Sequence, residues 1–234
     1  MNRHLDWEGC FNTRDLGGIP TRDGRTTARG ALVRSDAVHR LTARGWQRLW
    51  EYGVRTVIDL RNADEPGEDA APRPAGLTTL RIPLHPAGAV TDGIWGRGTP
   101  LAYRAFLRAH PGQTAAVLAA VAAAKEGGVL FHCAVGRDRT GLVSLVLLAL
   151  AGVSPAEIAA DYDLSADRLS PLFAAVGEPD PRHRLAALLA REGTTVRGAV
   201  EAALDSFDPE AHLGAGGLSG QQIAAVRTRL TAAS

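Results

Sequence analysis

One stretch of the chain restricts its fold more than any other: a cysteine loop that joins two apolar runs. The shorter run, residues 127–131, precedes the loop, and the longer run, residues 142–150, follows it. This pattern predicts a strand, a tight loop and a buried helix that begins at Thr140, an order typical of an α/β fold. The loop holds Cys133 and, after five intervening residues, Arg139.

A loop of this kind suits an anion. The first peptide N–H groups of a helix have no intrahelical acceptor, and the helix dipole adds partial positive charge at the same end. The same field favours the thiolate of Cys133, which is the nucleophilic form. The planar guanidinium of Arg139 can hold two phosphate oxygens at once, as an ammonium cannot. The loop therefore predicts a phosphate-monoester site, with the phosphate bound by Ala134, Val135, Gly136, Arg137, Asp138 and Arg139.

The reaction predicted for this loop needs no metal and no cofactor. The Cys133 thiolate attacks phosphorus in line and forms a thiophosphate intermediate, which water then hydrolyses. The departing oxygen needs a proton from a general acid. The candidates are Asp138 in the loop, Asp92 in a segment rich in Gly and Pro over residues 85–100, and Asp59 at the end of a predicted strand.

The loop resembles the signature of a known enzyme family. Its similarity to the His-Cys-x5-Arg-Ser/Thr pattern of protein tyrosine phosphatases and dual-specificity phosphatases is carried by His132, Cys133, Gly136, Arg139 and Thr140. Asp138 before the arginine and Gly141 after Thr140 resemble the loop of the atypical bacterial tyrosine and phosphoinositide phosphatases. That family usually carries lysine where this chain has Arg137, so the positive charge is kept on a different side chain.

Upstream segments resemble the same family. Residues 12–18, Asn-Thr-Arg-Asp-Leu-Gly-Gly, are similar to its Asn-Phe-Arg-Asp-Leu-Gly-Gly motif, with threonine in place of phenylalanine. Residues 32–35 and 59–61 resemble its Leu-x-Arg-Ser and Asp-Leu-Arg segments. We expect Arg14 and Asp15 to form an ionic network that holds the N-terminal strand in place.

The resemblance implies a cysteine-dependent phosphatase that acts on protein phosphotyrosine. It favours Asp138 as the general acid, because the atypical family lacks the mobile-loop acid of other tyrosine phosphatases, and it leaves Asp92 and Asp59 as alternatives. We also expect two supporting residues. Thr140 should hydrogen-bond the thiolate, and His132 should hold the loop through its ring and not act as a base.

Other functions stay open on the sequence. A phosphoinositide or a small phosphorylated metabolite presents the same dianion on an organic oxygen as phosphotyrosine does. A phosphate-binding module without turnover and a rhodanese-type sulfurtransferase, also built around a loop cysteine, are alternatives from other classes. Arg139 followed by Thr140 favours phosphate over sulfur transfer.

The rest of the chain completes an α/β pattern. Hydrophobic periodicity and turn residues predict strands over 31–36, 54–61 and 77–84, and helices over 42–52, 101–124 with a break at 111–112, 154–165, 182–191, 195–204 and 219–230. We expect one domain over residues 1–234, with four to five mostly parallel strands and helices on both faces. The cysteine loop should lie at the carboxyl end of a central strand. Residues 164–218 are expected to form a helical cap or lid.

Composition limits the partners and the compartment. The net charge of +1 gives no electrostatic case for nucleic acid. The two cysteines, Cys10 and Cys133, provide neither a disulfide framework nor a metal cluster, and a catalytic thiol fits a reducing compartment. The first eight residues lack the apolar stretch of a signal peptide, and the run over 142–153 is too short to span a bilayer. We therefore expect a cytoplasmic protein with a phosphorylated substrate, no membrane insertion and an oligomeric state that the sequence leaves open.

Overall fold

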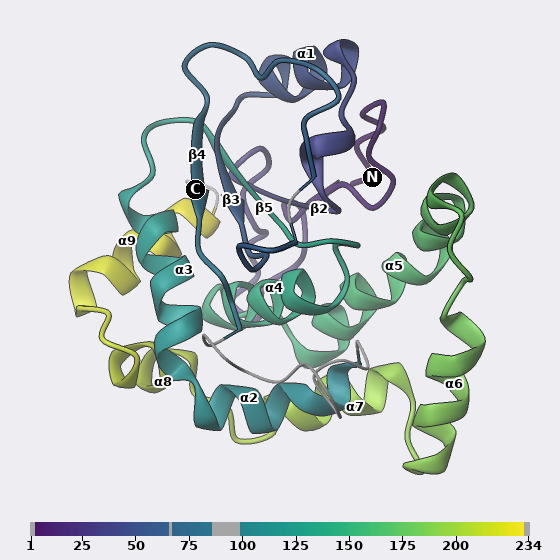
Figure 1. Cartoon of the computed structure of the whole chain (residues 1–234). Helices are drawn as coiled ribbons and strands as arrows, with labels where there is room; N and C mark the ends of the chain where they lie inside the picture. The colour runs from purple at the N-terminus through teal and green to yellow at the C-terminus, as the bar shows by residue number, and fades with distance from the viewer. Residues whose placement is uncertain (1–2, 66, 86–98, 232–234) are drawn as a thin grey trace.

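A five-stranded sheet forms the centre of the computed structural model, which describes residues 3–65, 67–85 and 99–231 (Figure 1). The strands are β1 (Arg14–Asp15), β2 (Leu32–Ser35), β3 (Val54–Asp59), β4 (Thr78–Arg81) and β5 (Gly128–His132), in the order β1-β2-β5-β3-β4. Strands β2, β5, β3 and β4 are parallel, whereas the edge strand β1 is antiparallel to β2. The predicted α/β class with a mostly parallel sheet is confirmed, and β5 is the central strand.

Helices cover both faces of this sheet (Figure 1). They are η1 (Val38–Arg40), α1 (Ala43–Glu51), η3 (Pro100–Ala102), α2 (Tyr103–Ala109), α3 (Pro111–Ala123), α4 (Asp138–Leu150), α5 (Pro155–Val176), α6 (Arg182–Arg191), α7 (Val196–Leu204), α8 (Pro209–Ala215) and α9 (Gly220–Leu230). Helix α1 lies against one face of the sheet, and α4 lies against the other. The predicted two-sided cover is therefore present.

The two faces bury separate cores because side chains alternate along a strand. Val33 of β2 and Leu130 of β5 point toward α1, where they pack with Trp46. Leu32 and Phe131, each adjacent to one of those strand residues, point to the opposite face and join the core that α3, α4 and α5 cover. A central strand buried on both faces explains why residues 128–132 are apolar almost without interruption.

The element boundaries differ from the predictions at a few places. Helix α4 begins at Asp138, two residues before the predicted Thr140, so Asp138 is its first residue. The helix break that the sequence predicts at residues 111–112 lies instead at His110, which separates α2 from α3. Helix α5 begins after the predicted Ser154 cap but continues to Val176, past the predicted end at residue 165.

The C-terminal third of the described chain is helical, as predicted. Val200 of α7, Leu213 of α8 and Val226 of α9 are buried in the same core as the α4 face of the sheet. The single-domain organisation and a lid over residues 164–218 stay predictions.

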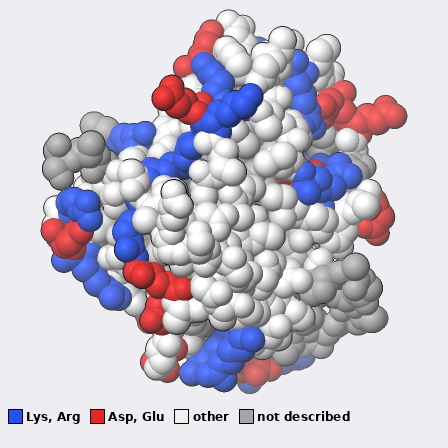
Figure 2. Space-filling view, turned by 90° about the vertical axis from the view of Figure 1, so that its left-hand side faces the viewer, with Lys and Arg blue, Asp and Glu red and all other residues white. Residues whose placement is uncertain are grey.

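The outer face on the side of α3, α8 and α9 carries a broad uncharged area with charged side chains around it (Figure 2). Lys and Arg residues (blue) and Asp and Glu residues (red) are interspersed around this uncharged area, so the described part of this face has no extended region of a single charge sign. No described helix combines the length and the apolar character that crossing a membrane requires.

Candidate active site

The cysteine loop lies where the sequence placed it, between the carboxyl end of β5 and the first turn of α4. Cys133 follows the last residue of β5 and is 2% exposed. Its side chain belongs to the core on the α4 face of the sheet, so the loop rests on packed apolar residues. A rigid base of this kind holds the loop backbone in one conformation.

The loop has its carbonyl oxygens turned toward the surrounding scaffold. The Cys133 oxygen accepts a hydrogen bond from His132 Nδ1 (3.0 Å), and the Arg137 oxygen accepts one from Gly141 N within α4 (2.7 Å). The oxygens of Ala134, Val135 and Gly136 accept hydrogen bonds from Ala37 N (3.1 Å), Asn12 Nδ2 (3.0 Å) and Arg34 Nη2 (2.8 Å), respectively. A trans peptide places its N–H opposite its carbonyl, and the described chain has no cis peptide. The N–H groups of residues 134–138 therefore point away from the scaffold.

These N–H groups form a cradle for an anion. Within the described residues, those of Ala134, Val135 and Gly136 have no protein acceptor. Successive N–H groups on one side of a loop at a helix N-terminus create a concave positive site. The contacts to the carbonyls thus fix the orientation of these N–H groups, and their binding of phosphate stays a prediction.

Gly136 allows the loop to approach the neighbouring strand. Its φ of +70° lies in the left-handed region, and a Cβ atom there would lie 2.5 Å from both Asp36 N and Ser35 O. Any side chain would force the loop away from β2 and would remove the contacts to its carbonyls.

The guanidinium of Arg139 is held by Glu65. Arg139 Nη1 lies 2.5 Å from Glu65 Oε1, and Nη2 lies 2.6 Å from Oε2. Burial disfavours the charge on Glu65, but hydrogen bonds from Arg139 and from the Asn62 N–H outweigh it, and its pKa is lowered. A two-point contact fixes the plane of the guanidinium. The sequence predictions missed Glu65, although its position just after β3, a neighbour of β5, was a usable signal.

Asp138 is the first residue of α4 and contacts groups from two other elements. Arg137 Nε lies 3.1 Å from its Oδ1, and the Tyr162 hydroxyl donates to the same oxygen at 3.2 Å. The Tyr103 hydroxyl donates to the Asp138 carbonyl oxygen at 2.6 Å. Burial disfavours the charge on Arg137, but the Asp138 carboxylate outweighs this effect and raises the pKa of Arg137. The carboxyl of Asp138 is therefore held by Arg137 and Tyr162 at the start of α4.

The ring of His132 contacts the loop backbone. Nδ1 carries a hydrogen, because it lies 3.0 Å from the carbonyl oxygen of Cys133, which can only accept. Burial lowers the pKa of His132 to about 4, although Asp59 opposes the shift. The ring is therefore neutral near pH 7, and its contact orients the loop.

Asp59 is occupied by Arg61 and is a poor candidate for the acid. Its carboxylate accepts the Arg61 backbone N–H at 3.0 Å and two guanidinium hydrogen bonds at 2.9 Å. Burial acts to raise its pKa, but Arg61 and His132 lower it overall. Asp92, the other alternative, lies outside the described residues.

Thr140 does not make the predicted contact with the nucleophile. Because α4 begins earlier than predicted, Thr140 lies inside its first turn and is fully buried. Within the described part of the chain its Oγ1 has no hydrogen-bond partner. A buried hydroxyl without a partner costs about 1–3 kcal/mol.

Arg14 and Asp15 hold the N-terminal strand through ionic contacts and hydrogen bonds, as expected, but with other partners and not with each other. The two residues are adjacent in β1 and point to opposite sides. Arg14 Nε donates to Asp161 in α5 at 3.1 Å. Asp15 accepts the backbone N–H groups of Gly17 and Gly30 at 2.7 and 2.8 Å and a hydrogen bond from Tyr52.

Asp161 connects the N-terminal motif to the phosphate loop. Its Oδ2 accepts from Arg34 Nη1 at 2.7 Å, and Arg34 in turn donates to Gly136. Burial acts to raise the pKa of Asp161, but Arg14, Arg34 and Arg3 lower it strongly overall. The Leu-x-Arg-Ser segment thus supports the loop through Arg34, a role that its sequence did not reveal.

The described residues contain no group of three or more His, Cys, Asp or Glu side chains placed to hold a metal ion. Cys10, the second cysteine, is buried, and burial raises the pKa of its thiol well above the usual value. Its Sγ lies 3.8 Å from the Ala37 carbonyl oxygen. It therefore has the properties of a structural thiol.

Comparisons with known proteins point to the same chemistry. A family model described as a tyrosine phosphatase family matches residues 5–232. A tyrosine-protein phosphatase of Nostoc commune is 37% identical over 147 residues, 59% of this chain and 49% of that protein. A Cupriavidus necator protein provisionally named a tyrosine-protein phosphatase is 31% identical over 172 residues, 69% of this chain and 63% of that protein.

A third relative is named as a phosphatase of triple specificity. The triple specificity protein phosphatase PtpB of Mycobacterium tuberculosis is 28% identical over 204 residues, which are 73% of this chain and 72% of that protein. The chain thus spans about half to two thirds of the length of the Nostoc and Cupriavidus relatives.

Proposed function

Because the chain belongs to the tyrosine phosphatase family, we propose that it is a cysteine-dependent phosphatase that hydrolyses protein phosphotyrosine. The observation that carries this proposal is the cradle itself. Ala37, Asn12 and Arg34 hold the carbonyls of Ala134, Val135 and Gly136 on the side of the scaffold, and the N–H groups face the other way, next to a cysteine. Such a loop stabilises the equatorial oxygens of a phosphoryl group in its transition state.

The reaction follows from the groups around the cradle. The phosphate dianion binds the loop N–H groups and the guanidinium of Arg139, which Glu65 already holds in one plane. The Cys133 thiolate attacks phosphorus, the bond to the tyrosyl oxygen breaks, and a thiophosphate forms on sulfur. Water then attacks phosphorus and releases inorganic phosphate and the thiolate.

Asp138 is the residue that we assign as general acid. It is the first residue of α4, directly after the loop, and its carboxyl accepts a hydrogen bond from the Tyr162 hydroxyl. Arg137 Nε lies 3.1 Å from the same carboxyl. As the general acid, Asp138 carries its proton into the reaction. The proton then goes to the departing phenolic oxygen.

Replacement of Asp138 by Asn should therefore act selectively on poor leaving groups. A general acid contributes about 10²–10⁴ in rate, so we expect turnover of phenyl or tyrosyl phosphate to fall by about 10²-fold or more. Nitrophenyl phosphate should lose less than about tenfold, because nitrophenolate departs without a proton. Steady-state kinetics on both esters with one variant makes the comparison, since both share the same cradle.

The ratio between the two esters is the informative quantity. A uniform loss would show that Asp138 only shapes the cradle. Asp92→Asn is the matched variant, and selectivity in that variant instead would assign the acid to Asp92. Selectivity in neither variant would contradict the in-loop acid altogether.

A substrate panel tests the function as a whole. We expect the wild-type protein to hydrolyse a phosphotyrosine peptide with a kcat/KM above those for a phosphoserine peptide, a phosphoinositide, and nucleotide and sugar phosphates. Thiosulfate should give no sulfur transfer. A clear preference for a metabolite or a phosphoinositide would replace phosphotyrosine as the substrate and leave the chemistry in place. Binding of phosphate without turnover of any ester would contradict the proposal.

A further inference from the structure

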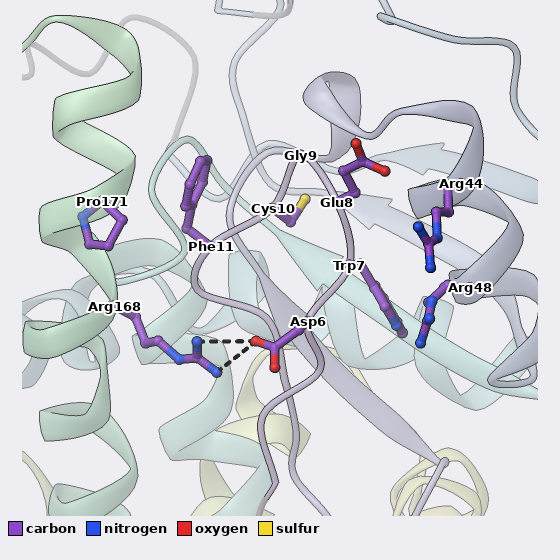
Figure 3. A pocket seen from close by; sticks show the side chains of 10 residues that line it. All are labelled: Asp6, Trp7, Glu8, Gly9, Cys10, Phe11, Arg44, Arg48, Arg168 and Pro171. Atoms are coloured by element: carbon purple, nitrogen blue, oxygen red, sulfur yellow. Dashed lines mark hydrogen bonds and ion pairs between the residues drawn. The ribbon is translucent and has the colours of Figure 1, made fainter.

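A cavity of about 640 Å³ opens beside the N-terminal segment of the chain (Figure 3). Its walls come from residues 6–11, from α1 and from α5. Trp7, Phe11 and Pro171 give it apolar surfaces, and Arg44, Arg48 and Arg168 give it positive charge. Cavities of about 300–1,000 Å³ with apolar walls and a few polar groups are typical binding sites.

Two of its arginines form an unbalanced pair. Arg44 and Arg48 lie one turn apart on α1, and Figure 3 shows both side chains on the side of the cavity that Trp7 occupies. Within the described residues, neither guanidinium has an ion pair or a hydrogen bond. Glu8 also lines the cavity and forms no ion pair with either of them.

This arrangement opposes the stability of α1. Like charges four residues apart on a helix repel each other. A cation in the first turn also faces the positive end of the helix dipole, and Arg44 occupies the first turn of α1, where no acidic residue is present. Arg48 lies in the last turn, where the dipole favours a cation, so the dipole effect concerns Arg44 alone. An anionic ligand beside Trp7 would relieve the repulsion between the two arginines and the unfavourable position of Arg44.

The opposite wall of the cavity is already neutralised. Arg168 Nη1 and Nη2 each lie 3.2 Å from Asp6 Oδ1, and Arg168 Nε donates to His4 Nδ1 at 3.0 Å. The excess positive charge is therefore confined to the side formed by Arg44 and Arg48.

The cavity and the phosphate loop share one segment of backbone. Phe11 lines the cavity, and its N–H donates to Asp36 Oδ1 at 3.1 Å. The next residue, Asn12, donates from its side chain to the Val135 carbonyl in the loop. The segment that carries Phe11 and Asn12 thus forms one wall of the cavity and one support of the loop.

We propose that this cavity is a second substrate site, which binds acidic side chains on the same polypeptide as the phosphotyrosine; the proposal rests on the phosphatase function above. Carboxylate or phosphate groups would pair with Arg44 and Arg48, and neighbouring apolar side chains would pack on Trp7 and Phe11. A peptide fits better than an anionic membrane, because a flat bilayer does not enter a recess and the net charge is only +1.

The test compares peptide pairs that differ only in charge. Each phosphotyrosine peptide carries a Glu-Glu pair at one offset from the phosphotyrosine, and its partner carries Gln-Gln at the same offset. A further set carries a second phosphate in place of Glu-Glu. The variant is Arg44→Gln/Arg48→Gln. Its matched control is Arg22→Gln/Arg184→Gln, which removes the same charge from exposed positions outside the cavity lining.

We expect the cavity variant to lower kcat/KM for the best acidic peptide by roughly tenfold, mainly through KM, since it removes two charge-assisted contacts. Nitrophenyl phosphate and the Gln-Gln peptides should be unaffected, and high salt should abolish the difference. The control should match the wild type throughout. The peptide set that loses more kcat/KM in the cavity variant, the Glu-Glu set or the set with a second phosphate, identifies the anion that the cavity favours.

Equal kinetics of the cavity variant and the control on every acidic peptide would overturn the proposal. So would a loss confined to the binding of phosphatidylserine vesicles, which would assign the pair to a lipid surface. If the wild type fails to hydrolyse nitrophenyl phosphate, the proposed function is wrong. Fluorescence anisotropy of a labelled, unphosphorylated Glu-Glu peptide would then still show whether Arg44 and Arg48 bind it.

Discussion

Replacement of Cys133 by serine should lower turnover of every phosphate monoester by at least about four orders of magnitude, as loss of a nucleophile does. A serine hydroxyl needs a base to remove its proton. The adjacent ring cannot supply one, because His132 Nδ1 already donates to the Cys133 carbonyl and the pKa of His132 is lowered to about 4. Affinity for inorganic phosphate should persist, since none of the carbonyl contacts that shape the cradle involves the sulfur.

Cys10→Ser is the matched control for this experiment. Cys10 is buried and its thiol lies against the Ala37 carbonyl oxygen, so its replacement should leave turnover of nitrophenyl phosphate unchanged. Iodoacetate should inactivate the wild type at mildly acidic pH, with phosphate as a protecting ligand. Substantial residual turnover by Cys133→Ser would remove Cys133 from the mechanism, and loss of activity in Cys10→Ser would indicate a partnership between the two thiols.

Replacement of Arg139 by lysine should lower kcat by about 10²–10³-fold, the usual effect of removing one stabilising donor from a transition state. The charge is retained, but an ammonium cannot match the two-point geometry of the guanidinium. It also cannot satisfy both oxygens of Glu65 as Nη1 and Nη2 do. Stopped assays with nitrophenyl phosphate and a phosphotyrosine peptide measure the loss.

Two further variants separate charge from orientation around Arg139. Glu65→Gln keeps Arg139 and its charge but weakens the contact that fixes its plane, so a smaller loss in kcat is expected.

Arg137→Ala should act mainly on substrates with a second anionic group, and an equal loss on all substrates would show that Arg137 shapes the loop. Wild-type kcat in Arg139→Lys would contradict the role of the guanidinium.

The strand, loop and helix around Cys133 could be predicted because each is encoded locally. The apolar residues of β5 and α4 flank the loop, and the glycine needed for its close approach, Gly136, lies within it. The start of α4 was misplaced by two residues, because the end of a loop and the first turn of a helix look alike in sequence. This error hid the position of Asp138 as the first residue of the helix.

The partners of the loop could not be predicted, because they come from distant parts of the chain. Glu65 meets Arg139 across 74 residues, and the contact depends on the pairing of β3 with β5. Arg34 reaches Gly136 because β2 pairs with β5 in a register that sets Arg34 opposite Phe131. Periodicity identifies strands, but it does not give their order in the sheet.

The partners of Arg14 and Asp15 could not be predicted for a different reason. Side chains alternate across a strand, so these two sequence neighbours do not meet. Arg14 instead meets Asp161, which is 147 residues away and lies in α5. Helix α5 continues past its predicted end because Leu169 and Leu172 are buried, and this packing outweighs the weak local pattern.

The chemical identity of the reaction intermediate tests the central claim most directly. Wild-type protein mixed with a phosphotyrosine peptide and quenched in acid within one turnover should carry one phosphate on the peptide that contains Cys133, detected by mass spectrometry. The adduct should be absent from Cys133→Ser and should disappear as free phosphate is released. Rapid turnover with no phosphorylated protein, or with the phosphate on another residue, would contradict the account.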